Sequence, residues 1–497
     1  MLLHHKKYHG PIQGKGIGPY ILAHLLPKTT LIGPNKSPQN VVFRLGYIKN
    51  DASVQPEPKI GNTLMKELKS TERVNARLRI PGSKSISHRV AIAAALGEGE
   101  SHIRDFLRCD DTLYTTEALA RLGVDISFGE GRLQVTGSAG DLCVPPAKEE
   151  IYLGNSGTSL RLLLSVAALA RGNVILTGSP RLNERPISDL IKALAQLGVS
   201  AQSLGKPGFP PVLVRGEGIS GGGATVDATQ SSQFVSSILL CAPYAQRDVE
   251  IEVTGDRVSL PYIDLTLDVM ERFGVSVERK GYKYFRIPAG QRYTGQDLTI
   301  EGDVSSASYF WAAAAVTGGQ VITENIYPYS TKQGDIGFLN LLEEMECQVK
   351  REKDQVTVRG AHLRAIEADL SQMPDMVPTL AAVSLFAEGR TSIRNVAHLR
   401  HKESDRLHTI ATQWKLLGGR VDELEDGLVI HGGYPLKPEA TDPHDDHRLA
   451  MSLAVIGLKL PDMVIKNHSC VNKSYPEFWS AWDKLCSQMS HQQATGR

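Results

Sequence analysis

Six small polar clusters recur along the chain, and each runs directly into an Ala/Leu-rich stretch with helical spacing. They begin at Ser83, Asn155, Ser231, Asp303, Asp375 and Asp445. The gaps between successive starts are 72, 76, 72, 72 and 70 residues. Such a constant period indicates one supersecondary unit repeated six times.

Each cluster is predicted to lie at the N-terminus of a helix. Helix N-termini carry unpaired backbone N–H groups and the positive end of the helix dipole, so they favour anions. Several such ends, if they converge, would form a site for a highly anionic small molecule.

The elements around each cluster also follow a regular order. Val74–Ile80 alternates with period two and is broken by Pro81-Gly82, which predicts a strand followed by a helix over 83–96. Five later segments look like a helix C-terminus before a short strand, and Gly occupies the expected left-handed position in four of them, with Glu346 in the other. These segments are 119–124, 194–199, 270–275, 342–347 and 414–419. Each repeat should therefore hold two helices and several strands, with the apolar first helix buried.

Length and charge limit the function classes. From its length of 497 residues, we expect the chain to form two to four domains. Its 55 Lys and Arg against 54 Asp and Glu argue against a general polyanion binder, so we expect no nucleic-acid partner.

The cysteines and the apolar stretches predict a cytoplasmic protein without a membrane partner. The cysteines are too far apart for a C-x-x-C metal motif, and reduced thiols fit best. Ser159–Ala170, the most apolar stretch, contains Arg161 and is too short to cross a bilayer. The cysteines are Cys109, Cys143, Cys241, Cys347, Cys470 and Cys486.

Residues 1–64 differ from the rest. Met1 to Asn50 contains seven Lys or Arg and no Asp or Glu. An organellar presequence is one reading, but the single Ser and the lack of an Arg-rich amphipathic pattern count against it. The alternatives are a poorly ordered extension, which we expect, or coding sequence upstream of a true start at Met65.

The first polar cluster places three anion-binding groups together. In Pro81–Arg89, Ser85 and Arg89 lie one turn apart on one helical face, and Lys84 lies at the helix entrance. A phosphate or carboxylate there would meet an ammonium, a hydroxyl and a guanidinium. The alternative is a capped helix with surface charges, whereas P-loop spacing is absent.

Two further clusters repeat this arrangement. In Gly154–Arg161, Gly157 lets a ligand approach the backbone and Arg161 lies one turn inward. Arg185 and the segment Ser231–Gln233 add donors suited to phosphate and hydroxyl groups.

The run Arg400–Arg406 carries a candidate proton carrier. If the run is helical, Lys402 and Arg406 are like charges at i,i+4 and would repel without a shared anion. Glu403 lies between them. The alternative is a solvated, charged helix face.

Pro443–Arg448 suggests two readings. His and Asp are good ligands for divalent ions, but we expect no metal, because Asp446 can cap the sixth helix while His447 and Arg448 point into a common cleft. Asp375 at the fifth helix start would ordinarily be an N-cap. Its place in the series makes it a candidate base.

Together these segments closely resemble the 5-enolpyruvylshikimate-3-phosphate synthase family of enolpyruvyl transferases. The resemblance runs from about Met65 to Lys484, and six motifs in order make it specific. The motifs are Pro-Gly-Ser-Lys-Ser-x-Ser-x-Arg (81–89), Gly-Asn-x-Gly-Thr (154–158), Glu-Arg-Pro (184–186), Ser-Ser-Gln-Phe (231–234), Lys-Glu-Ser-Asp-Arg (402–406) and Asp-His-Arg (446–448).

The resemblance implies an α/β fold, a two-domain inside-out α/β barrel built from six βαβαββ-like repeats, three per domain. Helices would lie inside and sheets outside. Residues 83–301 would form one domain, and 66–82 would join 302–490 in the other.

The implied reaction joins the 5-hydroxyl of shikimate 3-phosphate to C2 of phosphoenolpyruvate, protonates C3, and then expels phosphate. Asp375 is the expected proton acceptor, and Glu403 with Lys84 the expected proton carriers at C3 and the leaving phosphate. The implied shikimate 3-phosphate ligands are Lys84, Ser85, Arg89, Ser231, Ser232, Gln233, Ser259, Asp375 and Lys402. The implied phosphoenolpyruvate ligands are Lys84, Gly157, Arg185, Gln233, Arg406, Arg448 and Lys473.

The resemblance implies a monomer with two small-molecule substrates and no cofactor. The chain departs from the family at His398 and Asp445, where many relatives have Asn. Gly157 rather than Ala implies sensitivity to glyphosate, which occupies the phosphoenolpyruvate site in this family.

Two rivals differ in testable features. An enolpyruvyl transferase for a UDP-sugar typically begins with Gly-Ala-Lys-Asn-Ala and uses a loop cysteine, and neither is present here. A repeat-built phosphate-binding or RNA-end-processing protein would use the same helix ends without paired carboxylates. Its nucleic-acid binding would weaken steeply with salt.

Overall fold

Six buried helices follow the six polar clusters, as the repeat predicts. The computed structural model describes residues 65–129, 131–144, 149–255 and 258–487, so the extension 1–64 lies outside the described residues. Ser156, Asp303 and Asp446 each cap their helix by accepting a hydrogen bond from a backbone N–H of its first turn. The helices are α1 (Lys84–Leu96), α3 (Gly157–Leu169), α5 (Gln233–Cys241), α7 (Val304–Thr317), α9 (Val377–Ser384) and α11 (His447–Gly457).

A second, more exposed helix follows in each repeat. The predicted left-handed C-terminal positions are confirmed, because Gly123, Gly198, Gly274 and Gly418 have positive φ, and Glu346 has φ of 78° in the same role. These helices are α2 (Asp110–Arg121), α4 (Ser188–Gln196), α6 (Pro261–Arg272), α8 (Phe338–Glu344), α10 (Arg406–Leu416) and α12 (Phe478–Ser487).

The sheets repeat one topology. In each, an outer strand pairs parallel to the strand that follows a buried helix, and the remaining strands pair antiparallel. In spatial order, the first sheet consists of β14 (Asp297–Thr299), β3 (Glu100–Arg104), β5 (Arg132–Thr136) and β4 (Asp125–Gly129). The second consists of β6 (Glu149–Tyr152), β7 (Gly172–Thr177), β9 (Val212–Gly216) and β8 (Ser200–Ser203). The third consists of β10 (Gly222–Asp227), β11 (Val249–Thr254), β13 (Tyr284–Ile287) and β12 (Glu278–Lys280).

The other three sheets follow the same pattern, although the sixth has three strands among the described residues. The fourth sheet consists of β2 (Asn75–Arg79), β15 (Gln320–Glu324), β17 (Gln355–Arg359) and β16 (Gln348–Arg351). The fifth consists of β18 (Glu367–Asp369), β19 (Arg390–Arg394), β21 (Leu428–His431) and β20 (Arg420–Glu423). The sixth consists of β22 (Ala440–Thr441), β23 (Val464–Lys466) and β1 (Met65–Glu67).

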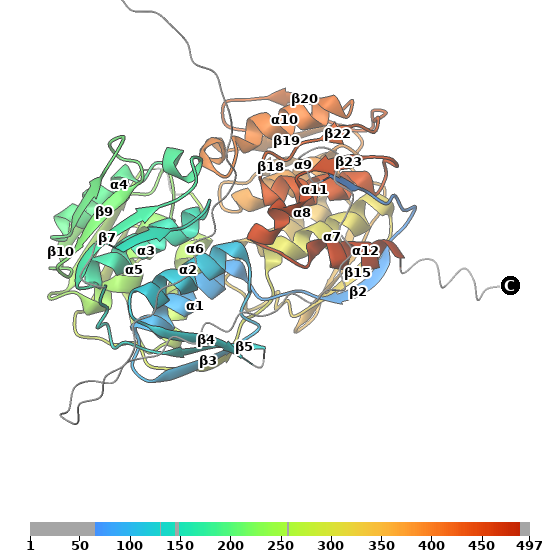
Figure 1. The fold of residues 1–497 in the computed structure, drawn as a ribbon. Coiled ribbons are helices and arrows are strands. Elements are labelled where there is room, and N and C mark those ends of the chain that lie inside the picture. The colour runs from blue at the N-terminus through green and yellow to red at the C-terminus, as the bar shows by residue number, and fades with distance from the viewer. Residues whose placement is uncertain (1–64, 130, 145–148, 256–257, 488–497) are drawn as a thin grey trace, which may run out of the picture. The chain divides into compact units, whose positions relative to one another are not determined.

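The buried side chains form two separate cores. One extends from Val90 to Ile300, and the other combines Leu68–Ile80 with Val304–Leu485. We call the elements around them lobe 1 and lobe 2. In lobe 1 the helices α1, α3 and α5 contact one another, and in lobe 2 so do α7, α9 and α11, with the sheets around each trio (Figure 1). The inside-out α/β fold with three repeats per lobe is therefore confirmed.

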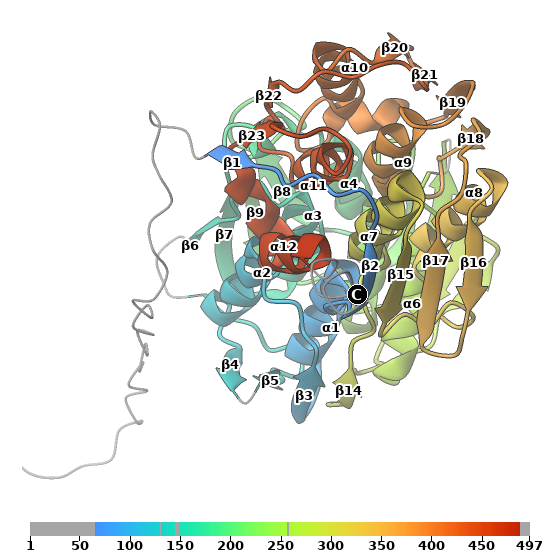
Figure 2. The same cartoon turned by 90° about the vertical axis from the view of Figure 1, so that its right-hand side faces the viewer.

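The strands β1 and β2 precede lobe 1 in the chain but belong to sheets of lobe 2, since β1 pairs with β23 and β2 with β15. The pairing of β2 with β15 is parallel, and β14 pairs in parallel with β3 of lobe 1. Figure 2 shows β2 beside β15 and β14 beside β3. The chain thus crosses twice between the lobes, and the two crossings bring α1 and α7 close together at their N-terminal ends: the backbone N–H of Lys84 donates to Asp303 Oδ2 at 2.9 Å.

All six cysteines are free thiols. No helix within the described ranges is both long and apolar enough to cross a bilayer.

Candidate active site

Helix N-termini from both lobes meet at one pocket, which we call the convergence pocket. Its lining comes from α1, α3, α5 and α11, from the segment before α9, and from the segment that leads into α10. The lining residues are Lys84, Ser85, Thr158, Arg161, Arg185, Gln230, Ser231, Ser232, Gln233, Ser259, Tyr262, Pro374, Asp375, His398, Lys402, Glu403, Arg406, His447 and Arg448. The structure therefore brings together most of the residues that the sequence nominated.

Asp375 lies where two guanidinium groups converge. Arg406 Nη1 donates to its Oδ1 at 2.9 Å, Arg448 Nη2 donates to its Oδ2 at 2.7 Å, and the Tyr262 hydroxyl donates at 3.2 Å. Burial works against its charge, but Arg448 and Arg406 hold the pKa of Asp375 well below its usual range. The carboxylate does not cap α9, since it lies in the short 3₁₀ turn Pro374–Met376 before that helix.

Glu403 is the second carboxylate of the pocket. Its Oε2 accepts from Arg406 Nη2 at 2.8 Å, and its Oε1 lies 3.5 Å from Arg185 Nη1 and 3.8 Å from Lys473 Nζ. Burial opposes its charge, but Arg185, Arg406 and Lys473 keep the pKa of Glu403 well below its usual range. Both carboxylates are ionised in this arrangement.

The helical reading of 400–406 is wrong. A 3₁₀ segment ends at His401, Lys402 has extended backbone angles, and α10 begins only at Arg406. The reason is that Asp405 acts as the N-cap of α10 and accepts from the backbone N–H of His408. Lys402 and Arg406 therefore do not share a helix face, although both line the pocket.

Lys402 has an unusual proton affinity. Burial lowers its pKa to about 7, with Arg161, Arg406 and Arg185 acting in the same direction and Asp375 opposing them. Without a bound anion, its ammonium and its neutral amine are thus almost equally favourable near neutral pH.

Asp111 is a functional candidate that the sequence reading missed. Its carboxylate accepts from Lys84 Nζ at 3.0 Å and from Lys473 Nζ at 2.5 Å, and Lys473 also donates to the Asn155 carbonyl at 2.9 Å. Asp111 is 2% exposed. It belongs to a second helix, α2, where the six-cluster pattern gives no signal.

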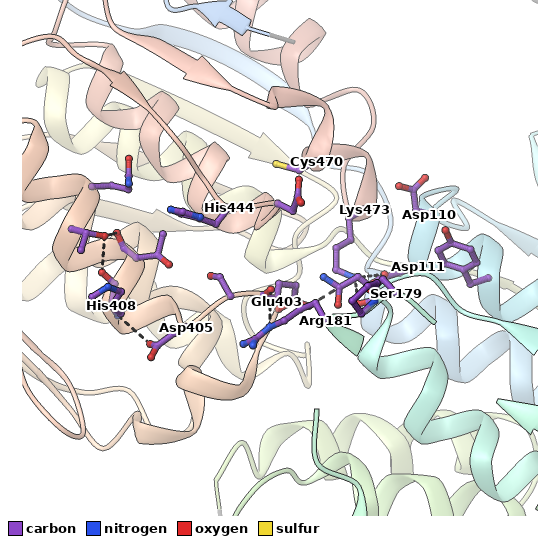
Figure 3. Close-up of a pocket in the computed structure, with 18 residues that line it drawn as sticks. Asp110, Asp111, Ser179, Arg181, Glu403, Asp405, His408, His444, Cys470 and Lys473 are labelled. Atoms are coloured by element: carbon purple, nitrogen blue, oxygen red, sulfur yellow. Dashed lines mark hydrogen bonds and ion pairs between the residues drawn. The ribbon is translucent and has the colours of Figure 1, made fainter. Parts of the chain in front are cut away.

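A second, larger pocket adjoins this cluster. It has a volume of about 920 Å³, and Figure 3 shows Asp111, Glu403 and Lys473 in its wall. The convergence pocket itself has only about 50 Å³ of free space, because its cations and carboxylates pair with one another across it. Anionic ligands in the convergence pocket must therefore exchange partners with these internal pairs.

Three nominated residues lie outside the lining. Lys473 lines the larger pocket instead, and the other two are Arg89 and Gly157. Arg89 is fully buried and donates to Thr266 Oγ1 at 2.7 Å and to the Ser85 carbonyl at 2.9 Å, so it supports the pocket from behind. Gly157 begins α3, and a Cβ there would lie 2.5 Å from the Arg185 guanidinium carbon.

Hydrogen bonds orient the α5 end of the pocket. Gln233 Oε1 accepts from Arg161 Nη1 at 3.0 Å, and Gln233 Nε2 donates to Thr158 Oγ1 at 3.0 Å. Ser259 has φ of 57°, and its N–H donates across the lobes to the Ser371 carbonyl at 2.9 Å.

His398 lines the convergence pocket, whereas Asp445 lines the larger one. Burial, with Lys402 in support, lowers the pKa of His398 to about 3, so its imidazole is neutral. Its Nε2 has no hydrogen-bond partner among the residues that the structure describes. This nitrogen is available to a ligand.

The side chains of 443–448 are not arranged as the ligands of a metal ion. Asp446 caps α11 and accepts from Arg406 Nε at 2.8 Å. In the described part of the chain, no three His, Cys, Asp or Glu side chains are grouped as metal ligands.

Known proteins match the chain over nearly all of its described length. The family model for EPSP synthase (3-phosphoshikimate 1-carboxyvinyltransferase) matches residues 68–482. A 3-phosphoshikimate 1-carboxyvinyltransferase from Syntrophobacter fumaroxidans is 44% identical over 432 residues, covering 85% of this chain and 100% of the relative. One from Methanoculleus marisnigri is 47% identical over 414 residues, covering 83% and 97%.

Solved structures agree. An EPSP synthase structure from Acinetobacter baumannii superposes with a TM-score of 0.72 at 27% identity, covering 85% of this chain and 98% of that one. With the sixfold fold and the convergence pocket described above, these matches show that the chain belongs to the EPSP synthase family of 3-phosphoshikimate 1-carboxyvinyltransferases.

Proposed function

We propose that the chain transfers the enolpyruvyl group of phosphoenolpyruvate to the 5-hydroxyl of shikimate 3-phosphate, by addition and elimination. The products are 5-enolpyruvylshikimate 3-phosphate and phosphate, on the route to chorismate and the aromatic amino acids. The observation that carries this proposal is the convergence pocket, where cations from both lobes surround two ionised carboxylates. Two phosphorylated carboxylates match that charge, and general acid–base groups lie among them.

Substrate binding would prepare Asp375 to act as a base. Arg406 and Arg448 pair with Asp375 here, and both are assigned to phosphoenolpyruvate. When the substrate carboxylate takes these guanidinium groups, their hold on Asp375 weakens and its proton affinity rises. Asp375 would then accept the proton of the attacking 5-hydroxyl.

Glu403 and Lys84 would complete the proton transfers. Glu403 is ionised in the ligand-free arrangement, but Arg185 and Arg406 are both assigned to phosphoenolpyruvate, so their transfer to that substrate would raise the pKa of Glu403 and let it take up a proton. In the addition step, the protonated Glu403 donates to C3 as the C2–O bond forms. In the elimination step, Glu403 takes a proton back from C3 while the C2–O bond to phosphate breaks. Lys84 supplies a proton to the departing phosphate oxygen.

The assignment of ligands follows the two substrates. We assign shikimate 3-phosphate to Lys84, Ser85, Arg89, Ser231, Ser232, Gln233, Ser259, Asp375 and Lys402. We assign phosphoenolpyruvate to Lys84, Gly157, Arg185, Gln233, Arg406, Arg448 and Lys473. Arg89 would act from a buried position, through its bond to the Ser85 carbonyl.

We propose domain boundaries that follow the two cores. Residues 83–301 form one domain, and 66–82 with 302–490 form the other, since Leu68–Ile80 packs in the second core. The protein is proposed to act as a cytoplasmic monomer on small molecules alone, with neither nucleic acid nor membrane as partner.

The rival functions have less support. A UDP-sugar transferase would need a loop cysteine, and no cysteine is among the residues that line the convergence pocket. The paired carboxylates Asp375 and Glu403 likewise have no role in a protein that only binds phosphate or RNA ends.

Phosphate release tests the proposed activity. The purified chain, with and without residues 1–64, is mixed with both substrates, and a reaction without shikimate 3-phosphate is the control. Release that requires both substrates supports the transferase. A folded protein that releases no phosphate in either form would overturn the proposal and favour the UDP-sugar enzyme or a non-catalytic relative.

Gly157→Ala should raise the inhibition constant of glyphosate and the KM for phosphoenolpyruvate. The new methyl group displaces the Arg185 guanidinium, which lies 2.5 Å from the added carbon. Overpacking of this kind costs about 1–3 kcal/mol, which corresponds to about fivefold to more than a hundredfold in the constants. Steady-state inhibition measures both values. Wild-type resistance to millimolar glyphosate would contradict the assignment.

Binding of shikimate 3-phosphate at pH 8 should take up about one proton at Lys402. With a pKa of about 7 the free side chain is mostly neutral at this pH, and a phosphate dianion stabilises its ammonium. Affinity should therefore fall as pH rises above 7. Calorimetry in two buffers with different ionisation enthalpies measures the uptake.

Lys402→Arg is the matched control, since a guanidinium stays charged over this range. Equal proton uptake by this variant and by the wild type would assign the proton to another group.

A further inference from the structure

One arginine of lobe 1 holds a backbone segment of lobe 2. Arg181 Nε donates to the carbonyls of Lys402 and Glu403 at 3.1 and 3.2 Å, and its Nη2 donates to the Arg400 carbonyl at 3.2 Å. Its Nη1 pairs with Glu184 at 3.0 Å, which orients the guanidinium. Figure 3 shows Arg181 extended towards Glu403.

The segment that Arg181 contacts, 400–403, includes the end of a 3₁₀ helix and the irregular residues that follow it. The 3₁₀ helix ends at His401, and α10 begins only at Arg406. Carbonyls at a helix C-terminus lack partners within the helix. A guanidinium presents five donors in a planar fork and can serve three carbonyls at once, which a lysine ammonium does less well.

The same loop of lobe 1 holds Glu403 twice. Arg181 donates a hydrogen bond to its carbonyl, and Arg185, four residues later, faces its carboxylate at 3.5 Å. We propose that Arg181 is a positioning residue: by holding segment 400–403 across the lobes, it places Lys402 and Glu403 for the reaction. The kinetic consequence rests on the proposed function, whereas the contact itself does not.

Kinetics test the positioning role. Arg181→Gln should lower kcat about 10²-fold, as expected when a catalytic group is displaced by about 1 Å. Arg181→Lys should recover part of that loss. Arg171→Gln removes an exposed surface arginine of the same lobe and should keep wild-type kcat. In a Glu403→Gln background, Arg181→Gln should cost less than about threefold, because residues that act through each other are not additive.

Hydrogen exchange provides a readout that needs no activity. In the ligand-free chain, amides of 400–405 should exchange about tenfold faster in Arg181→Gln than in the wild type, while Arg171→Gln leaves them unchanged. Faster exchange with lost kcat supports the proposal. Faster exchange with normal kcat, or lost kcat with unchanged exchange, overturns it.

Different results would contradict the transferase activity and the positioning role of Arg181. If wild type releases no phosphate but exchange at 400–405 rises in Arg181→Gln, the transferase proposal fails and the bridge between the lobes is supported. If wild type turns over both substrates and Arg181→Gln matches it in kcat and exchange, the positioning role is overturned and the transferase stands.

Discussion

Asp375→Asn should lower kcat by at least about 10²–10⁴-fold, the usual contribution of a positioned base. The amide keeps the shape of the carboxylate but cannot accept the hydroxyl proton. Steady-state phosphate release measures the loss. Asp369→Asn, six residues earlier in the chain, removes a carboxylate that lies outside the pocket and serves as the matched control.

The same change also has a measurable effect on stability. Asp375 is the only carboxylate that pairs with Arg448 in the described part of the chain. Removing one partner of a buried pair destabilises a protein by about 3–5 kcal/mol. Arg406 loses less, because Asp446 and Glu403 remain beside it. The melting temperature of the ligand-free variant should therefore fall, and bound phosphoenolpyruvate with shikimate 3-phosphate should restore part of it. A kcat within tenfold of wild type would refute the assigned role.

Glu403→Gln should lower kcat by about 10²–10⁴-fold, because it removes the group that carries protons to and from C3. During turnover in D₂O, deuterium enters the C3 position of the substrate through this group. We expect the rate of deuterium incorporation to fall by a factor similar to kcat. Mass spectrometry of recovered phosphoenolpyruvate and product measures it.

Glu388→Gln is the control for this variant, since Glu388 is 74% exposed and pairs only with His362 among the described residues. Wild-type kcat in Glu403→Gln, or unchanged deuterium incorporation, would remove Glu403 from the proton path. Glu403→Gln also weakens the link to Arg185, so its KM for phosphoenolpyruvate should rise.

Much of the fold is predictable because it depends on local patterns. The six polar clusters mark helix starts through capping chemistry, and glycines mark the left-handed ends of the second helices. Even Glu346, where glycine is missing, keeps the positive φ, because the surrounding repeat imposes the same turn. Three repeats per lobe follow from the resemblance.

What the sequence does not reveal depends on partners far apart in the chain. Asp111 binds Lys473 across 362 positions, and Arg181 reaches the carbonyl of Lys402 across 221. No periodicity encodes such pairs. The charge spacing at i,i+4 predicts a helix that includes Lys402, but Asp405 caps a helix that begins only at Arg406.

The early position of β1 and β2 imposes an order on biosynthesis. Met65 of β1 pairs with Lys466, and Asn75 of β2 pairs with Gln320, so the first strands among the described residues belong to sheets whose other members are made much later. At about 5–20 residues per second, β1 waits roughly 20–80 s for its partner. Lobe 1 can close once β14 is made, while β1 and β2 still present unpaired edges, which are prone to aggregation. Within the described residues, the nascent chain therefore most needs chaperone protection at β1 and β2.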